Sequence, residues 1–371
     1  MKKVTDIKEL AGKRVLLRAS LNIPLKDGKV RNMFRIERAL QTLRYLSEAG
    51  ARVVVIAHIG REKDETLKPV FNELVKFLPI HWGGDILSEE FKSRRDIMSN
   101  GDILLAENMR QHDGEKANDP EFVEAIAENG EVYVNDAFAA AHRNHASTYG
   151  VAKILPAYAG LTLSEEVVEL TKVMDPESPS LFLLGGAKFD TKMPLVEKYL
   201  GLYDHVFIGG AIANDILKAK GFEVGKSLVS DVSLEGSALL ASPKLILPID
   251  LIVDGPDGKQ VRGLDEVRPE EKILDCGQLT IDMLATYIEK AKTVLWNGPF
   301  GAYELGYTQS TEITARHMAA ADAHTVIGGG DTVAAVEKLE INDLLSFVSI
   351  GGGSMLTFLE KGRTDVIDLL S

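Results

Sequence analysis

The sequence predicts an α/β protein in which doubly wound, parallel sheets form two domains. Three observations lead to this fold class. At 371 residues the chain is longer than one ordinary hydrophobic core accommodates. Its 45% hydrophobic and 26% charged residues are typical of a globular protein. Short apolar runs alternate with amphipathic helical patterns, and this alternation favours parallel strands connected by helices.

The first half contains five apolar runs that predict strands, with helical patterns between most of them. In the helix expected at 35–49, Ile36, Leu40 and Leu43 recur at helical spacing. A second helix is expected at 120–129, because Pro120 suits its first position. The expected strands are 14–17, 53–56, 80–82, 103–105 and 132–134.

A helical stretch at 164–174 ends at the helix-breaking sequence DPESP (175–179). We therefore expect residues 156–180 to be an interdomain helix and hinge. An N-terminal domain of residues 1–155 precedes it, and a second domain of residues 181–354 follows.

In the second half, six apolar runs end abruptly in glycine, proline or asparagine. Ligands of open α/β sheets bind beyond the carboxyl ends of the strands, where glycine lets the backbone approach closely. Six such endings on one edge suggest a wide cleft suited to phosphate, although a residue such as Pro248 could mark a plain turn. The runs are 181–184, 206–208, 245–247, 294–296, 326–327 and 347–350.

The first of these runs leads into the sequence GGAKFDTK (185–192). If a helix starts near Ala187, Lys188 and Lys192 lie one turn apart on the same face. Two ammonium groups beside a helix N-terminus and two glycines form a polyphosphate site. The open alternative is a pair of solvated surface lysines.

Polar side chains follow the strands of the first half. Arginine suits fork-like recognition of phosphate and carboxylate, so this placement predicts a pocket for a small, multiply charged anion. Taken singly, each residue could be a solvated charge. Asp136 we interpret as a structural partner for a nearby arginine or histidine. The other residues are Asn22, Arg35, His58, Arg61, Arg110, His142, Arg143 and His145.

Asp331 follows a triple glycine and is a candidate Mg²⁺ ligand, because that ion takes one or two carboxylates together with phosphate oxygens. The alternative role for Asp331 is the N-cap of a helix at 332–337. Glu304 could accept hydrogen bonds from a ribose. Together, the two halves suggest phosphoryl transfer from a nucleotide on one domain to an anionic acceptor on the other.

Charge and composition exclude several classes of partner. The net charge is −13; residues 1–155 carry 24 Lys and Arg against 23 Asp and Glu, and residues 156–371 carry 18 against 32. This balance argues against nucleic acid as a partner. Without an apolar leader or a run of 18 apolar residues, and with Cys276 as the single cysteine, we expect a cytoplasmic protein with no membrane partner.

Nine segments in order resemble phosphoglycerate kinases: ASLNIP (19–24), AHIGR (57–61), ENMR (107–110), VNDAFAAAHRNHAST (134–148), GGAKFDTK (185–192), IGGAIAN (208–214), WNGPFGAYE (296–304), GGGDT (328–332) and SIGGGS (349–354). The resemblance covers nearly the whole chain. It implies two Rossmann-like domains joined by a hinge, with a C-terminal tail, about 355–371, returning to the N-terminal domain. It also implies reversible phosphoryl transfer between 1,3-bisphosphoglycerate and ADP, giving 3-phosphoglycerate and ATP with Mg²⁺. We expect a monomer that acts on these small molecules.

The same resemblance assigns roles to individual residues. Those implied for phosphoglycerate are Ser20, Asn22, Arg35, His58, Arg61, Arg110 and Arg143. Those implied for the Mg²⁺-nucleotide are Gly186, Lys188, Lys192, Gly210, Asn297, Glu304, Gly329, Gly330, Asp331 and Thr332, with Asp331 on the metal. Those implied for the transfer itself are Arg35, Lys192, Gly330 and Gly353. A carboxylate acceptor is already ionised at neutral pH, so the chemistry requires charge compensation rather than a general base.

The chain departs from the family pattern at two informative positions. Ser20 replaces the aspartate that contacts the substrate hydroxyl, which predicts altered substrate affinity. Ile273 replaces a glycine near the nucleotide base, which predicts a narrower or reshaped pocket. Two alternative functions remain. A nicotinamide-dependent oxidoreductase would need the dinucleotide-binding motif GxGxxG after a strand, and no strand leads into one. The other alternative is a non-catalytic nucleotide-binding scaffold.

Overall fold

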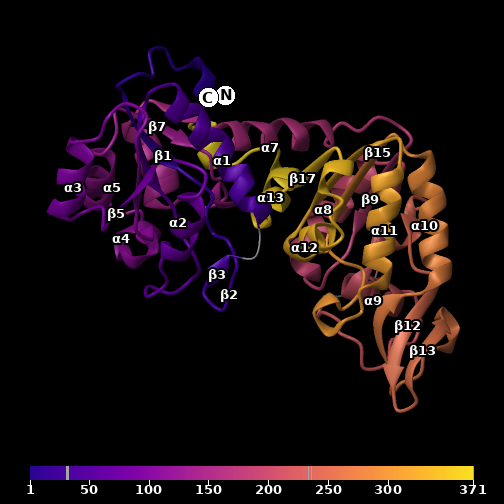
Figure 1. Cartoon of the computed structure of the whole chain (residues 1–371). Coiled ribbons are helices and arrows are strands. Elements are labelled where there is room, and N and C mark those ends of the chain that lie inside the picture. The colour runs from indigo at the N-terminus through magenta and orange to yellow at the C-terminus, as the bar shows by residue number, and fades with distance from the viewer. Residues whose placement is uncertain (31–32, 233, 235, 371) are drawn as a thin grey trace. The chain divides into compact units, whose positions relative to one another are not determined.

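The computed structural model describes residues 1–30, 33–232, 234 and 236–370, which divide into two compact units. Unit 1 comprises Met1–Val168 with Arg363–Ser371, and unit 2 comprises Glu169–Gly362. The chain passes from one unit to the other within helix α7 (Leu161–Lys172) and returns after Gly362 (Figure 1).

Unit 1 is built on a parallel sheet with the strand order β5-β6-β4-β1-β7-β8. The five expected strands are confirmed to within two residues, and β8 is an addition. The strands are β1 (Arg14–Arg18), β4 (Arg52–Ile56), β5 (Ile80–Gly84), β6 (Ile103–Ala106), β7 (Val132–Asn135) and β8 (Ala157–Ala159). The helices are α1 (Met33–Glu48), α2 (Lys68–Leu74), α3 (Glu89–Asp96), α4 (Asp113–Ala117), α5 (Pro120–Ala127), α6 (Val151–Ile154) and α14 (Asp365–Asp368), and a small ribbon pairs β2 (Leu25–Lys26) with β3 (Lys29–Val30).

The central strands of unit 1 are apolar along their whole length because both faces of the sheet are covered. In β1, Val15, Leu16 and Leu17 are fully buried, and β4 is buried from Val53 to Ile56. Helix α1 turns Ile36, Leu40 and Leu43 into the same core, as its spacing predicts. The interiors of these two strands therefore carry apolar side chains, and Arg18 is placed at the end of β1.

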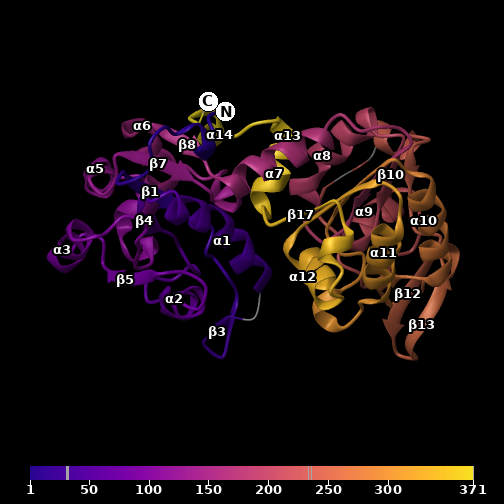
Figure 2. The same ribbon diagram turned by 45° about the horizontal axis from the view of Figure 1, so that its top comes forward.

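The two ends of the chain lie together in unit 1, as Figure 2 shows. The Lys2 N–H donates to the Leu370 carbonyl at 2.6 Å, and the Asn144 amide donates to the Asp365 carboxylate at 2.9 Å. Helix α13 (Gly353–Lys361) belongs to unit 2, where the Lys198 ammonium donates to the Leu359 carbonyl at 2.7 Å. The return to unit 1 thus begins at Arg363 rather than near residue 355.

Unit 2 has a second parallel sheet, with the strand order β11-β10-β9-β15-β16-β17. Its strands are the six apolar runs of the sequence, so their carboxyl ends do share one edge, as expected. The strands are β9 (Ser180–Leu184), β10 (His205–Ile208), β11 (Leu245–Ile246), β15 (Thr293–Asn297), β16 (His324–Gly328) and β17 (Phe347–Ser349). The remaining helices are α8 (Phe189–Leu202), α9 (Gly210–Ala219), α10 (Gln278–Lys290), α11 (Gln309–Ala320) and α12 (Gly330–Lys338).

An antiparallel sheet in unit 2, not expected from the sequence, has the order β13-β12-β14 (Figure 1). It comprises β12 (Asp250–Gly255), β13 (Gly258–Gly263) and β14 (Lys272–Cys276). Pro256 and Asp257 form the turn between β12 and β13, and Gly258 follows at φ +73°. This is ordinary turn composition, so the sequence did contain a signal for the hairpin.

The buried Asp136 fixes the start of α7. Its carboxylate accepts a hydrogen bond from the Leu163 N–H at 3.0 Å and bonds from the Thr42 and Thr162 side chains. An arginine is near, as expected, because the charge of Arg38 lowers the pKa of Asp136, but the hydrogen bonds from Leu163, Thr42 and Thr162 were not expected. Burial raises the pKa of Asp136 to about 6, although these hydrogen bonds act to lower it.

The raised pKa of Asp136 makes the stability of unit 1 depend on pH. The folded state binds this proton more tightly than the unfolded state, so stability falls as pH rises from the ordinary aspartate pKa to about 6. Asparagine at position 136 does not ionise. The free energy of unfolding of Asp136→Asn relative to the parent should therefore rise by roughly 3 kcal/mol between about pH 4 and pH 7.

Urea unfolding measures this difference in a Trp296→Phe background, where Trp82 reports on unit 1 alone. All other carboxylates are common to both proteins, so their titration cancels. A difference that stays constant across this pH range would contradict the raised pKa.

Candidate functional site

A cluster of cationic and imidazole side chains lies at the carboxyl edge of the unit 1 sheet. Arg18 ends β1, and its Nη2 lies 2.5 Å from Nδ1 of His58, which follows β4. Both side chains are buried, with exposures of 1% and 6%. Burying a guanidinium costs free energy unless its N–H groups are hydrogen-bonded. A buried arginine beside a buried histidine therefore marks this strand end as a candidate functional site.

Side chains from the neighbouring strand ends hold the loop after β4. The Asn22 side-chain oxygen accepts from the Gly60 N–H at 2.9 Å, and the Arg110 guanidinium donates to the Gly60 carbonyl. Asn108 bonds both backbone groups of Ile59, at 3.2 and 3.0 Å. The loop is therefore positioned by residues that follow β1 and β6.

Five of the expected residues, His58, Arg61, Arg110, Arg143 and His145, are close enough to affect one another electrostatically. Burial lowers the pKa of His58 well below its ordinary value, and Arg18, Arg110, Arg143 and His145 lower it further. Burial and the charge of Arg61 lower the pKa of Arg143. So many cations in one place make this edge a strong attractor for an anion.

Four further predicted residues of unit 1 differ in their exposure. Ser20 is 7% exposed and follows Ala19, whose carbonyl accepts from the Arg18 Nη1 at 2.6 Å. Arg35 is half-buried at the third position of α1. Asn22 and Arg61 are exposed, so they remain accessible to a ligand.

Sequence reasoning missed three buried members of this cluster, Arg18, Glu115 and Ser147. Arg18 could have been found, because the strand expected at 14–17 extends by one residue and places it at the carboxyl end. Glu115 lies in the short helix α4 and has an exposure of 0%. The sequence has no local signal for Glu115, since most acids of such a segment face solvent.

In unit 2, glycine loops at adjacent strand ends interlock. The N–H groups of Gly185 and Gly186 donate to the carbonyls of Asn297 and Pro299, at 2.9 and 2.8 Å. A Cβ at Gly185 would lie 2.2 Å from the Pro299 oxygen, and one at Gly210 would lie 2.6 Å from the Gly186 nitrogen. Only glycine allows backbones to approach so closely, which explains why these positions lack side chains.

The two lysines behind these glycines are arranged differently from the expectation. Helix α8 begins at Phe189, and Lys188 is its N-cap residue with a non-helical φ of −95° and ψ of 85°. The expected start near Ala187 is therefore wrong, and the lysines do not share one helical face. Lys188 is exposed, whereas Lys192 is 8% exposed and donates to the Gly185 carbonyl at 2.5 Å. Burial lowers the pKa of Lys192 to about 8, against the charge of Asp331.

Asp331 occupies the second position of α12 rather than its N-cap, which is Gly329 at φ +101°. The alternative capping role is therefore wrong. Thr332, the next residue, accepts a hydrogen bond from the Gly298 N–H at 3.0 Å. Asp331 is consequently exposed at the start of a helix, beside the loop that follows β15.

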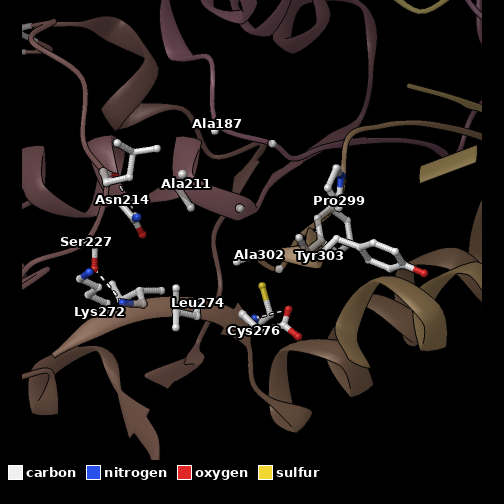
Figure 3. A pocket seen from close by; sticks show the side chains of 18 of the residues that line it. Ala187, Ala211, Asn214, Ser227, Lys272, Leu274, Cys276, Pro299, Ala302 and Tyr303 are labelled. Atoms are coloured by element: carbon white, nitrogen blue, oxygen red, sulfur yellow. Dashed lines mark hydrogen bonds between the residues drawn. The ribbon is translucent and has the colours of Figure 1, made fainter. Parts of the chain in front are cut away.

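A cavity of about 810 Å³ opens beside these loops within unit 2 (Figure 3). Four of the residues expected to bind a nucleotide line it: Gly186, Gly210, Glu304 and Asp331. The others lie outside its lining, namely Lys188, Lys192, Asn297, Gly329, Gly330 and Thr332, as does Gly353, which was expected to act in the transfer itself. The cavity is large enough for a nucleotide and largely apolar along the wall formed by β14.

The β14 wall was largely missed by sequence reasoning, because the strand itself was not expected. Ile273 does line the cavity, as anticipated, and its N–H donates to the Ser227 hydroxyl at 2.7 Å. Leu274, Asp275 and Cys276 extend the same wall, with Asn214 of α9 nearby in Figure 3. Burial raises the pKa of Asp275 to about 6.

Among the residues described, no group of three or more His, Cys, Asp or Glu side chains is arranged to hold a metal ion. Two exposed carboxylates line the cavity, Glu304 and Asp331, and Asp331 follows the glycine loop after β16. Mg²⁺ commonly binds through one or two carboxylates with the remaining ligands from substrate phosphate and water. The donor set therefore fits a metal that arrives with a nucleotide rather than a resident metal.

The close loop contacts predict a difference between two glycines that both have positive φ. Gly298 (φ +92°) and Gly306 (φ +87°) should each lose about 1 kcal/mol of stability when changed to alanine. A Cβ at Gly298 would also lie 2.5 Å from the Gly185 oxygen and 2.8 Å from the Lys192 Nζ, whereas nothing lies within 4 Å at Gly306. Gly298→Ala should therefore lose a further ~1–3 kcal/mol, measured by urea unfolding of unit 2 through Trp296. Equal losses for the two variants would show that the loops are not in close contact.

Comparison with known proteins identifies the family. A sequence model of the family described as "Phosphoglycerate kinase" matches residues 4–362. Phosphoglycerate kinases of Chelativorans sp. (strain BNC1) and Brucella melitensis biotype 1 are each 40% identical, covering 97% and 100% of this chain and 96% and 99% of the relatives. Among solved structures, phosphoglycerate kinase from Coxiella burnetii has a TM-score of 0.85 at 36% identity, covering 99% of this chain and 97% of that one. That from Pyrococcus horikoshii OT3 has a TM-score of 0.91 at 28% identity, covering 100% and 98%. This chain belongs to the phosphoglycerate kinase family.

Proposed function

We propose that this chain catalyses reversible phosphoryl transfer between 1,3-bisphosphoglycerate and ADP, giving 3-phosphoglycerate and ATP, a step of glycolysis. The observation that carries the proposal is the buried cationic cluster of unit 1 in a chain that matches the family over residues 4–362. A three-carbon acid with a phosphate group at one end and a carboxylate at the other needs several donors in one small pocket.

In unit 1, the proposed phosphoglycerate site is formed by donors that follow the parallel strands. Arg110 and Arg143 supply guanidinium groups, and the uncharged imidazole of His58 supplies one N–H. Charge-assisted hydrogen bonds of this kind are about twice as strong as those between neutral groups. The remaining proposed contacts are Ser20, Asn22, Arg35 and Arg61.

In unit 2, the proposed nucleotide site is the cavity beside the glycine loops. The apolar β14 wall suits a base, Glu304 suits the ribose hydroxyls, and Asp331 suits a Mg²⁺ ion held together with the phosphates. The Lys192 ammonium, whose pKa is about 8, is mostly charged at neutral pH, and a phosphate group beside it would raise that pKa. The other proposed contacts are Gly186, Lys188, Gly210, Asn297, Gly329, Gly330 and Thr332.

The proposed chemistry needs positioning and charge compensation rather than a base. The acceptor carboxylate is already ionised, and two unit charges about 4 Å apart repel by ~4 kcal/mol at an effective dielectric of ~20. Arg35 and Lys192 are proposed to compensate the charge on the phosphoryl group, and the backbone N–H groups of Gly330 and Gly353 to hold its oxygens. When bound, Mg²⁺ neutralises nucleotide phosphate charge.

Small anionic metabolites are the proposed partners, with the chain acting as a cytoplasmic monomer. No helix in the described part of the chain is long and apolar enough to cross a membrane. The single cysteine, Cys276, is buried and forms no disulfide, which agrees with a reducing compartment. Sedimentation at micromolar concentration tests the monomeric state, and a dimer would contradict it.

The direct test is a coupled assay with 3-phosphoglycerate and MgATP, in which ADP release is recorded. Turnover that requires both substrates supports the proposal. Binding of nucleotide without turnover, in the presence of both substrates and Mg²⁺, would instead identify a non-catalytic scaffold. Replacing Mg²⁺ with a chelator should abolish turnover and weaken nucleotide binding.

Arg35→Ala should lower kcat by about two orders of magnitude or more while leaving the Kd for MgADP nearly unchanged, because the charge is needed in the transition state. Arg35→Lys is the matched control, since it keeps the charge but loses the planar fork. Lys192→Ala should weaken nucleotide binding and turnover together. Equal loss of nucleotide affinity in Arg35→Ala would show that Arg35 is structural.

Ser20→Asp should lower the Kd for 3-phosphoglycerate by about tenfold, because a carboxylate reaches further and accepts a stronger hydrogen bond from the substrate hydroxyl. Ser20→Asn has nearly the same shape without the charge and should gain less. Isothermal titration of both variants measures the difference. No gain, or weaker binding in Ser20→Asp, would show that this pocket differs from the family geometry.

A further inference from the structure

A continuous run of hydrogen bonds connects the buried Glu115 to His58 through two intervening side chains. The Ser147 hydroxyl donates to Glu115 Oε1 at 2.6 Å, and the Ser147 N–H donates to Oε2 at 3.0 Å. The Arg18 Nε–H donates to the Ser147 oxygen at 2.9 Å. Arg18 Nη2 then lies 2.5 Å from His58 Nδ1. We refer to these four residues as the Glu115–His58 relay.

The direction of every bond in the relay follows from its two ends. The Arg18 Nε–H can only donate, so the Ser147 oxygen accepts from it, and the Ser147 hydroxyl proton is directed to Glu115 Oε1. A guanidinium only donates, so His58 Nδ1 must be the unprotonated nitrogen. A neutral imidazole has one N–H, which is therefore on Nε2.

Burial makes this arrangement rigid. Glu115 and Ser147 have exposures of 0%, and Arg18 has 1%, so water does not compete for these groups. Ser147 lies in a π-turn, Ala146–Gly150, in which three successive N–H groups donate to the His145 carbonyl. The Tyr133 hydroxyl also donates to the Ser147 carbonyl at 2.7 Å. π-Turns of this kind recur at functional sites.

A purely structural ion pair would not require this geometry. Arg18 could have contacted Glu115 directly, whereas Ser147 stands between them and turns the guanidinium toward His58. His145 also lies near Glu115, with its Nδ1 3.8 Å from Oε1, and the charge of Glu115 acts on Arg110 as well. The charge of Glu115 acts on Arg18 electrostatically, and the Ser147 hydroxyl adds a hydrogen-bonded connection between the two.

We propose that Glu115 and Ser147 are positioning residues that act through Arg18 to hold His58 as the Nε2–H tautomer, so that this N–H donates to the anionic substrate. Only the identity of that substrate, 3-phosphoglycerate, rests on the proposed function; the tautomer of His58 does not. The same principle operates in metal sites and catalytic triads, where a second partner selects the tautomer of a histidine.

The first test uses the unmodified protein. Nitrogen-15 NMR of the histidine rings at about pH 7 should show His58 as a neutral ring, with protonated Nε2 and unprotonated Nδ1. An imidazolium or an Nδ1–H tautomer for His58 would overturn the proposal, whatever any variant does. This readout does not depend on the substrate.

The second test removes the hydroxyl. Ser147→Ala should give a mixture of His58 tautomers and raise the Kd for 3-phosphoglycerate by about tenfold, while the Kd for MgADP stays unchanged. Tyr133→Phe is the matched control: it removes an equally buried hydroxyl that also bonds Ser147 but lies outside the relay. It should leave the tautomer and the 3-phosphoglycerate Kd within twofold of the parent.

A single Nε2–H tautomer and an unchanged 3-phosphoglycerate Kd in Ser147→Ala would refute the relay. If Ser147→Ala does not fold, Glu115→Gln read by the same NMR experiment decides, because a mixture of tautomers is again expected. Failure of the unmodified protein to bind 3-phosphoglycerate, with the tautomer as predicted, would reject the substrate and leave the relay intact.

Discussion

Parallel hydrogen bonding between neighbouring strands is the constraint on which the candidate site of each unit depends. In each unit the central sheet is parallel throughout, so the residue that ends one strand lies beside the residue that ends the next. Strand interiors are apolar because both faces are covered, and polar groups are consequently confined to the ends. Chemistry collects at the carboxyl edge as a consequence of this packing.

The carboxyl edges of the two sheets differ in the groups that they bring together, which are charged side chains in unit 1 and backbone groups in unit 2. Unit 1 gathers cationic groups that repel each other. The buried Glu115 partly offsets this repulsion, because its charge favours the protonated forms of Arg18, Arg110 and His145. Unit 2 instead brings backbone close to backbone, and the missing side chains of Gly186 and Gly298 leave room for Lys192 to donate to the Gly185 carbonyl. Binding a polyphosphate requires exposed N–H groups, whereas binding a small acid requires many charged donors.

Sequence reasoning succeeded where one local pattern was sufficient and failed where a partner distant in sequence decided the outcome. The strand ends and their arginines follow from apolar runs and strand order. The start of α8 was expected two residues too early. The Gly186 N–H donates to the Pro299 carbonyl, Gly186 has a φ of +93°, and the backbone is still non-helical at Lys188. The hydrogen bond from Leu163 to Asp136 was missed because α7, to which Leu163 belongs, begins 25 residues after Asp136.

The sequence by itself determined the fold class, the two sheets, the family and the residue types at the strand ends, since these depend on periodicity and on contiguous motifs. The tertiary structure alone decided that Glu115, Ser147 and Arg18 meet, and that β14 forms the cavity wall. Glu115 and Ser147 are 32 residues apart, and Ser147 and Arg18 are 129 apart. No local pattern encodes such contacts, because burial and hydrogen-bond partners are set by how the whole chain packs.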